Sequence, residues 1–211
     1  MRTSIFTLLL CLVVGIATAS ANSVTPSFYG PVGYLFTPSA DTLGKGNYML
    51  SMHHRARRNL LAMTYSPLNS VEVGVTMLDP TRPGQEKTEV ALNAKLLLLR
   101  EGQNNPALAV GMWDVADWME QTPYAVLSKD VSLPWPKRPA RFSAGYGGGM
   151  YKERGFGGVM LPLSPSVTTM AEFDGTNANV GLRMELPRGF TLDVGAVNWE
   201  LGVGASFGAK W

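Results

Sequence analysis

The sequence predicts an all-β protein, a single antiparallel transmembrane β-barrel of about twelve strands. Three observations predict this class. Apolar residues alternate with small or polar residues from about residue 46 to the end of the chain, and turn-forming residues separate the alternating runs. Charged residues make up only 16% of the chain, against roughly 25% in soluble domains, which favours a protein with part of its surface away from water.

The first 21 residues have the features of a secretory signal peptide. Arg2 precedes an apolar run at residues 5–16, and small residues lead to an expected cleavage site after Ala21. The run is shorter than the roughly 20 residues that a membrane-spanning helix needs. Cleavage would leave Asn22 as the first mature residue and would remove Cys11, the only cysteine. We therefore expect no disulfide in the mature chain.

Residues 22–45 form a segment before the first expected strand, and residues 46–211 form the expected barrel. The sequence leaves three arrangements open for the segment: another strand, a plug of the lumen, or a periplasmic arm.

The strands follow from a period of two. In the run SVEVGVTML, Val71, Val73, Val75 and Met77 share one face, which a strand allows and a helix does not. Proline, glycine, asparagine and aspartate occupy the intervals between the runs, as turns require. The expected strands lie at residues 47–54, 59–66, 70–78, 87–99, 106–113, 122–132, 140–147, 155–162, 167–174, 178–186, 189–197 and 200–210.

Alternation also fits a soluble β-sandwich or a lipocalin-like barrel. The faces opposite the apolar ones are rich in Gly, Ser, Thr and Asn and carry few lysines, whereas a sheet face in water usually carries more charge. A sheet in lipid must close, because every backbone donor and acceptor has to be satisfied internally. With the mature N-terminus in the periplasm, an even strand number returns the C-terminus there and places the short Pro- and Gly-rich turns on that side. We therefore favour the membrane barrel.

Charged residues gather on the non-lipid side of several expected strands. One lumen polar cluster lies on adjacent strands near the C-terminus and consists of Glu172, Asp174, Arg183, Glu185 and Asp193. Buried charges must pair or meet water. A barrel of about twelve strands is narrow, between filled eight-stranded barrels and open porins. We expect a salt-bridged filling of the lumen; the alternative is a polar lining for a sugar chain.

The sequence offers no catalytic site, metal site or cofactor motif. His53 and His54 are adjacent in an expected strand, so they point to opposite faces and cannot easily share a metal. Ser51 lies about 7 Å from His53 along the strand, too far for a nucleophile and its base. The 18 basic and 16 acidic residues nearly balance, which argues against nucleic acid as a partner.

Two further features concern the surface. Arg55, Arg57 and Arg58 form a basic patch at an expected outer loop; it could contact lipid phosphates or an acidic glycan, or be a solvated loop. At the C-terminus, Phe207 and Trp211 lie on the apolar face of the last strand. An aromatic last residue resembles the assembly signal that the barrel-assembly machinery reads, and Trp211 would lie in the interfacial aromatic belt.

The chain also resembles the YjbH-like (GfcD-like) family of outer-membrane proteins of exopolysaccharide and group 4 capsule biosynthesis. The resemblance rests on short motifs, namely PSFYGPVGYLFTPSADTLGKGNY, YAVLSKDVS, RFSAGYGGG, LGVGAS and the stretch from Glu172 to Arg183. It implies a bacterial outer-membrane location and a part in the export or assembly of a surface polysaccharide, with the polysaccharide and other export components as partners. From the residues themselves we expect the protein to be no enzyme and to have outer-membrane lipid and the barrel-assembly machinery as further partners. The alternatives are a structural or adhesive barrel without a glycan role and a secreted soluble β-sandwich.

Overall fold

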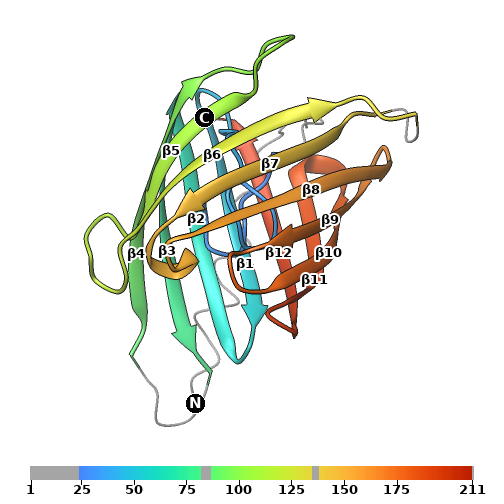
Figure 1. The fold of residues 1–211 in the computed structure, drawn as a ribbon. Coiled ribbons are helices and arrows are strands. Elements are labelled where there is room, and N and C mark those ends of the chain that lie inside the picture. The colour runs from blue at the N-terminus through green and yellow to red at the C-terminus, as the bar shows by residue number, and fades with distance from the viewer. Residues whose placement is uncertain (1–23, 82–86, 135–137, 211) are drawn as a thin grey trace.

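The computed structural model describes residues 24–81, 87–134 and 138–210. The expected signal peptide and Trp211 lie outside the described residues. Twelve antiparallel strands form one closed barrel in which β1 pairs with both β2 and β12 (Figure 1). The prediction of a twelve-stranded antiparallel barrel is confirmed, and each strand lies within two residues of its expected bounds.

The strands are β1 (Asn47–Arg55), β2 (Arg58–Leu68), β3 (Val71–Pro80), β4 (Glu89–Leu99), β5 (Ala107–Trp113), β6 (Thr122–Val131), β7 (Ala140–Gly147), β8 (Arg154–Ser164), β9 (Val167–Phe173), β10 (Ala178–Glu185), β11 (Phe190–Val197) and β12 (Glu200–Lys210). Two single 3₁₀ turns, η2 (Gly149–Tyr151) and η3 (Pro187–Gly189), lie between strands. Among the residues that the structure describes, no helix is long and apolar enough to cross a membrane.

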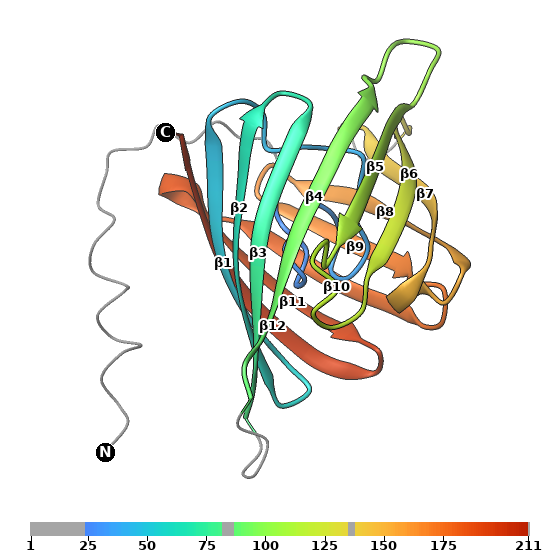
Figure 2. The ribbon, with the colours of Figure 1, turned by 90° about the vertical axis from the view of Figure 1, so that its left-hand side faces the viewer.

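The two ends of the barrel differ. We call the end where β1 begins and β12 ends the proximal end; it also carries the turns after β2, β4, β6, β8 and β10. The opposite end, with the turns after β1, β3, β5, β7, β9 and β11, is the distal end. Figure 2 shows the β4–β5 turn standing above the rest of the proximal end.

The outer face of the barrel is apolar. Large hydrophobic side chains are exposed at alternate positions around the strands, for example Met63, Met77, Leu92, Leu96, Leu127, Phe142, Val180, Leu182 and Val203. A soluble protein rarely exposes so wide an apolar surface, whereas a lipid-facing band requires it. Trp118 and Trp199, in distal loops, are 63% and 81% exposed, as expected for side chains at a membrane interface.

Residues 25–40 lie inside the barrel and residues 41–45 lead from them to β1 (Figures 1 and 2); we call the whole segment, residues 24–45, the plug. Every residue from Thr25 to Ala40 is buried. The segment contains no strand of its own; tight turns fold it, with two isolated bridges and hydrogen bonds such as Phe28 N–H to the Leu35 carbonyl at 2.8 Å. Of the three arrangements that the sequence leaves open, the structure has the plug.

The outward face generates a test. Leu182, in the middle of β10 and 39% exposed, should lie at the bilayer midplane, and Leu186, just after β10 and 42% exposed, at its edge. We expect Leu182→Arg to lower the free energy of unfolding in lipid vesicles by about 2–4 kcal/mol and Leu186→Arg by about 0–1 kcal/mol, measured by guanidinium titration. Equal costs at the two positions would contradict a lipid-facing band.

Candidate functional site

The plug is held by charged side chains of the barrel wall. Glu72 on β3 and Lys95 on β4 are register partners and form an ion pair with an N···O distance of 3.0 Å. Glu72 accepts the Val32 N–H at 3.0 Å, and the Lys95 ammonium donates to the Val32 carbonyl at 3.0 Å. Both side chains are buried, so the pair neutralises its charges and binds both backbone groups of one plug residue at once.

A second buried ion pair lies across β10 and β11. Arg183 donates to both carboxylate oxygens of Asp193, at 2.8 and 3.1 Å, in the bidentate geometry that makes such pairs strong. The same guanidinium donates to the carbonyl of Gly33 in the plug at 3.1 Å. His53 Nε2 lies 3.8 Å from Asp193, and the His53 ring stacks on Phe28 of the plug at 4.3 Å between centroids.

Glu172 on β9 forms the third anchor. Its carboxylate accepts the N–H groups of Phe36 and Thr37 at 2.8 and 3.0 Å and the Thr37 hydroxyl at 2.7 Å. Asn179 donates to both Glu172 and Asp174, at 3.1 and 3.2 Å. A continuous hydrogen-bonded path therefore joins the β9–β10 turn, where Asp174 caps two N–H groups, to the plug.

The structure thus brings four of the five residues of the lumen polar cluster to the plug or its anchors. Glu185 is apart from them, at the proximal end of β10, where it lines a pocket. Glu172 and Arg183 bind plug backbone groups directly, whereas Asp174 and Asp193 are joined to the plug through Asn179 and Arg183. Sequence reasoning missed this partner because carbonyl and N–H groups occur in every residue and leave no pattern.

Small residues in the wall leave room for large side chains of the plug. A Cβ atom at Gly202 on β12 would lie 2.4 Å from the Phe28 ring, and Cβ atoms at Gly181 and Gly195 would lie 2.8 and 2.7 Å from Leu35 Cδ1. These distances are too short for any side chain to fit without displacing the plug. The glycines therefore act as sockets for Phe28 and Leu35.

An aromatic layer lies toward the distal end of the lumen. Tyr29 of the plug packs on Trp113 at 5.8 Å and Phe36 of the plug packs on Tyr151 at 6.0 Å between ring centroids, and the two plug rings are 4.9 Å apart. The Trp113 indole N–H donates to the Tyr29 carbonyl at 3.1 Å. Arg55 donates to the Tyr29 hydroxyl at 3.1 Å and lies over both plug rings.

The three arginines of the expected basic patch do not form one surface. Arg55 turns inward onto the plug, as described above. The Arg58 guanidinium on β2 lies 3.9 Å from the Glu89 carboxylate on β4. Arg57 occupies the β1–β2 turn in the left-handed region, with φ of 64°.

The two histidines lie on opposite faces, as their adjacency predicts. His53 is buried and His54 contacts Asn59 at 2.8 Å on the exposed side. Within residues 24–81, 87–134 and 138–210 no three His, Cys, Asp or Glu side chains converge as metal ligands. Phe207 packs on Phe190 at 5.0 Å between centroids; its part in assembly stays a prediction.

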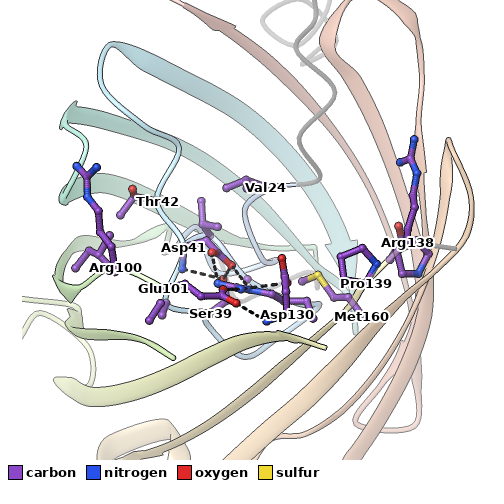
Figure 3. A pocket seen from close by; sticks show the side chains of 18 of the residues that line it. Val24, Ser39, Asp41, Thr42, Arg100, Glu101, Asp130, Arg138, Pro139 and Met160 are labelled. Carbon is purple, nitrogen blue, oxygen red and sulfur yellow. Dashed lines mark hydrogen bonds and ion pairs between the residues drawn. The ribbon is translucent and has the colours of Figure 1, made fainter. Parts of the chain in front are cut away.

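A pocket of about 480 Å³ opens at the proximal end, between the end of the plug and the wall from β4 to β10 (Figure 3). At its centre the Arg141 guanidinium binds Asp41 of the plug at 2.5 Å, Asp130 at 3.1 Å, and Glu101. Burial raises the pKa of Glu101, but the Asp130 N–H and the Arg141 guanidinium outweigh it and hold that pKa below its usual value. This carboxyl is therefore ionised at neutral pH.

Comparison with known proteins adds two findings. The family model YjbH, described as exopolysaccharide biosynthesis protein YbjH, matches residues 25–194, which include the plug. The fold is similar to a solved structure of a KdgM porin, with a TM-score of 0.55 and 11% sequence identity, over 78% of this chain and 99% of that chain. At this identity the likeness concerns the fold alone. No curated protein has significant similarity to the chain.

The glycine sockets give a prediction about stability. We expect Gly202→Ala to lower the free energy of unfolding by about 1–3 kcal/mol, because the new methyl group overlaps the Phe28 ring, measured by denaturation in detergent. Gly155→Ala is the control, because the nearest atom to its new Cβ is 3.7 Å away. Adding Phe28→Leu to Gly202→Ala should recover part of the loss; no recovery would contradict a socket for Phe28.

The anchors give a prediction about conductance. In planar bilayers we expect the wild-type protein to give no stable current of porin size, because the plug fills the lumen. Glu172→Ala leaves buried plug N–H groups without acceptors, so we expect channel openings in that variant. Glu89→Ala, which removes an exposed carboxylate from the distal end, should remain closed. A stable open current in the wild type would contradict a filled lumen.

Proposed function

Because the chain belongs to the YjbH family of exopolysaccharide biosynthesis proteins and folds into a closed twelve-stranded barrel with an apolar outer face, we propose that it assists the export or assembly of a surface exopolysaccharide from the bacterial outer membrane. Removal of the signal peptide would precede its insertion there. Its partners would be outer-membrane lipid, the barrel-assembly machinery, the polysaccharide and other export components, with the proximal end in the periplasm.

The plug is the single observation that defines the kind of assistance. Three sets of buried charged groups and a layer of aromatic rings hold it in the lumen. A polysaccharide could cross this lumen only after the plug left it. The charged wall side chains that anchor the plug would then lose their partners. An accessory role beside an export route therefore fits this barrel better than a role as the conduit.

A non-enzymatic role is the simplest reading of the lumen. Ser51 and His53 share the inner face of β1 but make no hydrogen bond with each other, and His53 faces Phe28 and Asp193. Hydrolysis through a covalent intermediate usually requires a nucleophile within hydrogen-bond distance of its base. Among the described residues, Ser51 and His53 were the pair that the sequence analysis considered as a nucleophile and its base.

Deletion of the gene tests the proposal. We expect the deletion strain to lose a large part of its surface exopolysaccharide, measured as cell-bound and released sugar, and a plasmid copy of the wild type to restore it. A plasmid copy that carries Glu89→Gln is a control and should restore the exopolysaccharide as well. Unchanged exopolysaccharide in the deletion strain would overturn the proposal and favour a structural or adhesive barrel, whereas recovery of the protein from the periplasm without detergent would overturn the membrane location.

A further inference from the structure

The proximal pocket lies at the mouth of the barrel and adjoins the anchored part of the plug, because Val32 and Gly33 are among its lining residues. Its volume of about 480 Å³ lies within the range of about 300–1,000 Å³ that small-molecule sites occupy. It is built from seven strands and the end of the plug, so many distant parts of the chain converge on it. Nothing in the fold of a closed barrel requires an open space of this kind at one mouth.

The centre of the pocket offers acceptors. The Arg141 guanidinium is shared by three carboxylates, those of Asp41, Glu101 and Asp130. Each carboxylate has about four lone-pair sites, so these three retain acceptor positions that Arg141 does not fill. Glu185 adds a fourth carboxylate, which makes no hydrogen bond or ion pair with the described part of the chain.

The rim offers donors. Arg100 and Arg138 lie on opposite sides of the central cluster (Figure 3). Within the described ranges the Arg100 guanidinium has no hydrogen-bond partner, and Arg138 has one long contact of 3.4 Å to the Pro165 carbonyl. Both guanidinium groups therefore keep most of their donors free for a ligand.

The charges of the site cancel. Its lining carries the acidic groups Asp41, Glu101, Asp130 and Glu185 and the basic groups Arg100, Arg138 and Arg141. Lys129, which lies outside the lining, is 3.4 Å from Glu101. With Lys129 counted, four negative and four positive groups leave no net field to concentrate an ion of either sign. What remains is a dense mixture of donors and acceptors. Between them lie apolar surfaces, notably Leu97, Pro139, Met160 and Pro162.

We propose that this pocket binds a short, uncharged oligosaccharide segment. Sugar hydroxyl groups both donate and accept hydrogen bonds, so they can use the free carboxylate and guanidinium positions together, while the C–H faces of the rings cover the apolar lining. A charged segment would gain no net attraction from a site whose acidic and basic groups balance. The identification of the ligand as a glycan rests on the proposed function; the donor, acceptor and charge pattern decides that it is uncharged.

The occupant would also touch the plug. Asp41 belongs to the plug and Arg141 to β7, and Ser39 and Ala40 of the plug line the same pocket. A bound segment is therefore in contact with the wall and with the element that closes the lumen.

Binding to the purified full-length protein in detergent tests the inference. The probes are short fragments of the surface polysaccharide of the same organism, released by partial hydrolysis and separated into neutral and uronic-acid-bearing fractions. By calorimetry we expect the neutral fraction to bind, and Asp130→Asn and Glu185→Gln each to weaken it by about tenfold. Glu89→Gln should have no effect, because it changes a carboxylate that also faces an arginine and is similarly exposed, but at the distal end.

Each outcome is decisive. Absence of binding by the neutral fraction, stronger binding by the acidic fraction, or equal weakening by Glu89→Gln would overturn the pocket. Glu185→Gln removes no contact within the described structure, and retention of the heat-dependent shift in gel migration shows that a variant is folded. Binding that persists although gene deletion leaves exopolysaccharide unchanged would overturn the proposed function and keep the pocket. Loss of exopolysaccharide without binding would do the reverse.

Discussion

The structure depends on hydrogen bonds between charged side chains of the wall and the backbone of the plug. A buried segment without helix or strand has N–H and C=O groups that must find partners elsewhere. Here Glu72, Lys95, Glu172 and Arg183 supply them. The dependence is mutual, because the same backbone groups satisfy charges that would otherwise be costly in a narrow lumen.

Shape reinforces this electrostatic match. Phe28 and Leu35 occupy spaces that exist only because Gly202, Gly181 and Gly195 have no side chains. Charge therefore fixes the backbone of the plug, and steric fit fixes its side chains. Together they make the filled lumen one well-packed interior. We therefore assign the proposed role in exopolysaccharide export or assembly to the surfaces and mouths of the barrel and not to its lumen.

The sequence predicted the wall well, whereas it left the plug as one of three arrangements open for residues 22–45. Each strand has one face in a uniform apolar environment, so the period of two and the turn residues were sufficient to place all twelve strands. The plug has no uniform environment: Val32 meets an ion pair, Phe28 a histidine ring and Phe36 a carboxylate.

The sites depend on the same long-range geometry. We expected Arg55 in an outer-loop patch, but its side chain reaches from the distal end of β1 to the Tyr29 hydroxyl of the plug. Arg141 and Asp41 are a hundred residues apart in sequence, and their contact requires both barrel closure and plug position. Local patterns carry no information about either.

The position of the plug along the chain has a consequence for the order of assembly. The plug precedes every strand, yet its partners are spread from His53 on β1 to Gly202 on β12. Its full set of contacts cannot exist until the final strand is in place beside the first. Such dependence on contacts distant in sequence slows folding. The strands of the wall must therefore close around a plug segment that is already inside. If the barrel closed before the plug entered, the buried charges of the wall would be left without partners.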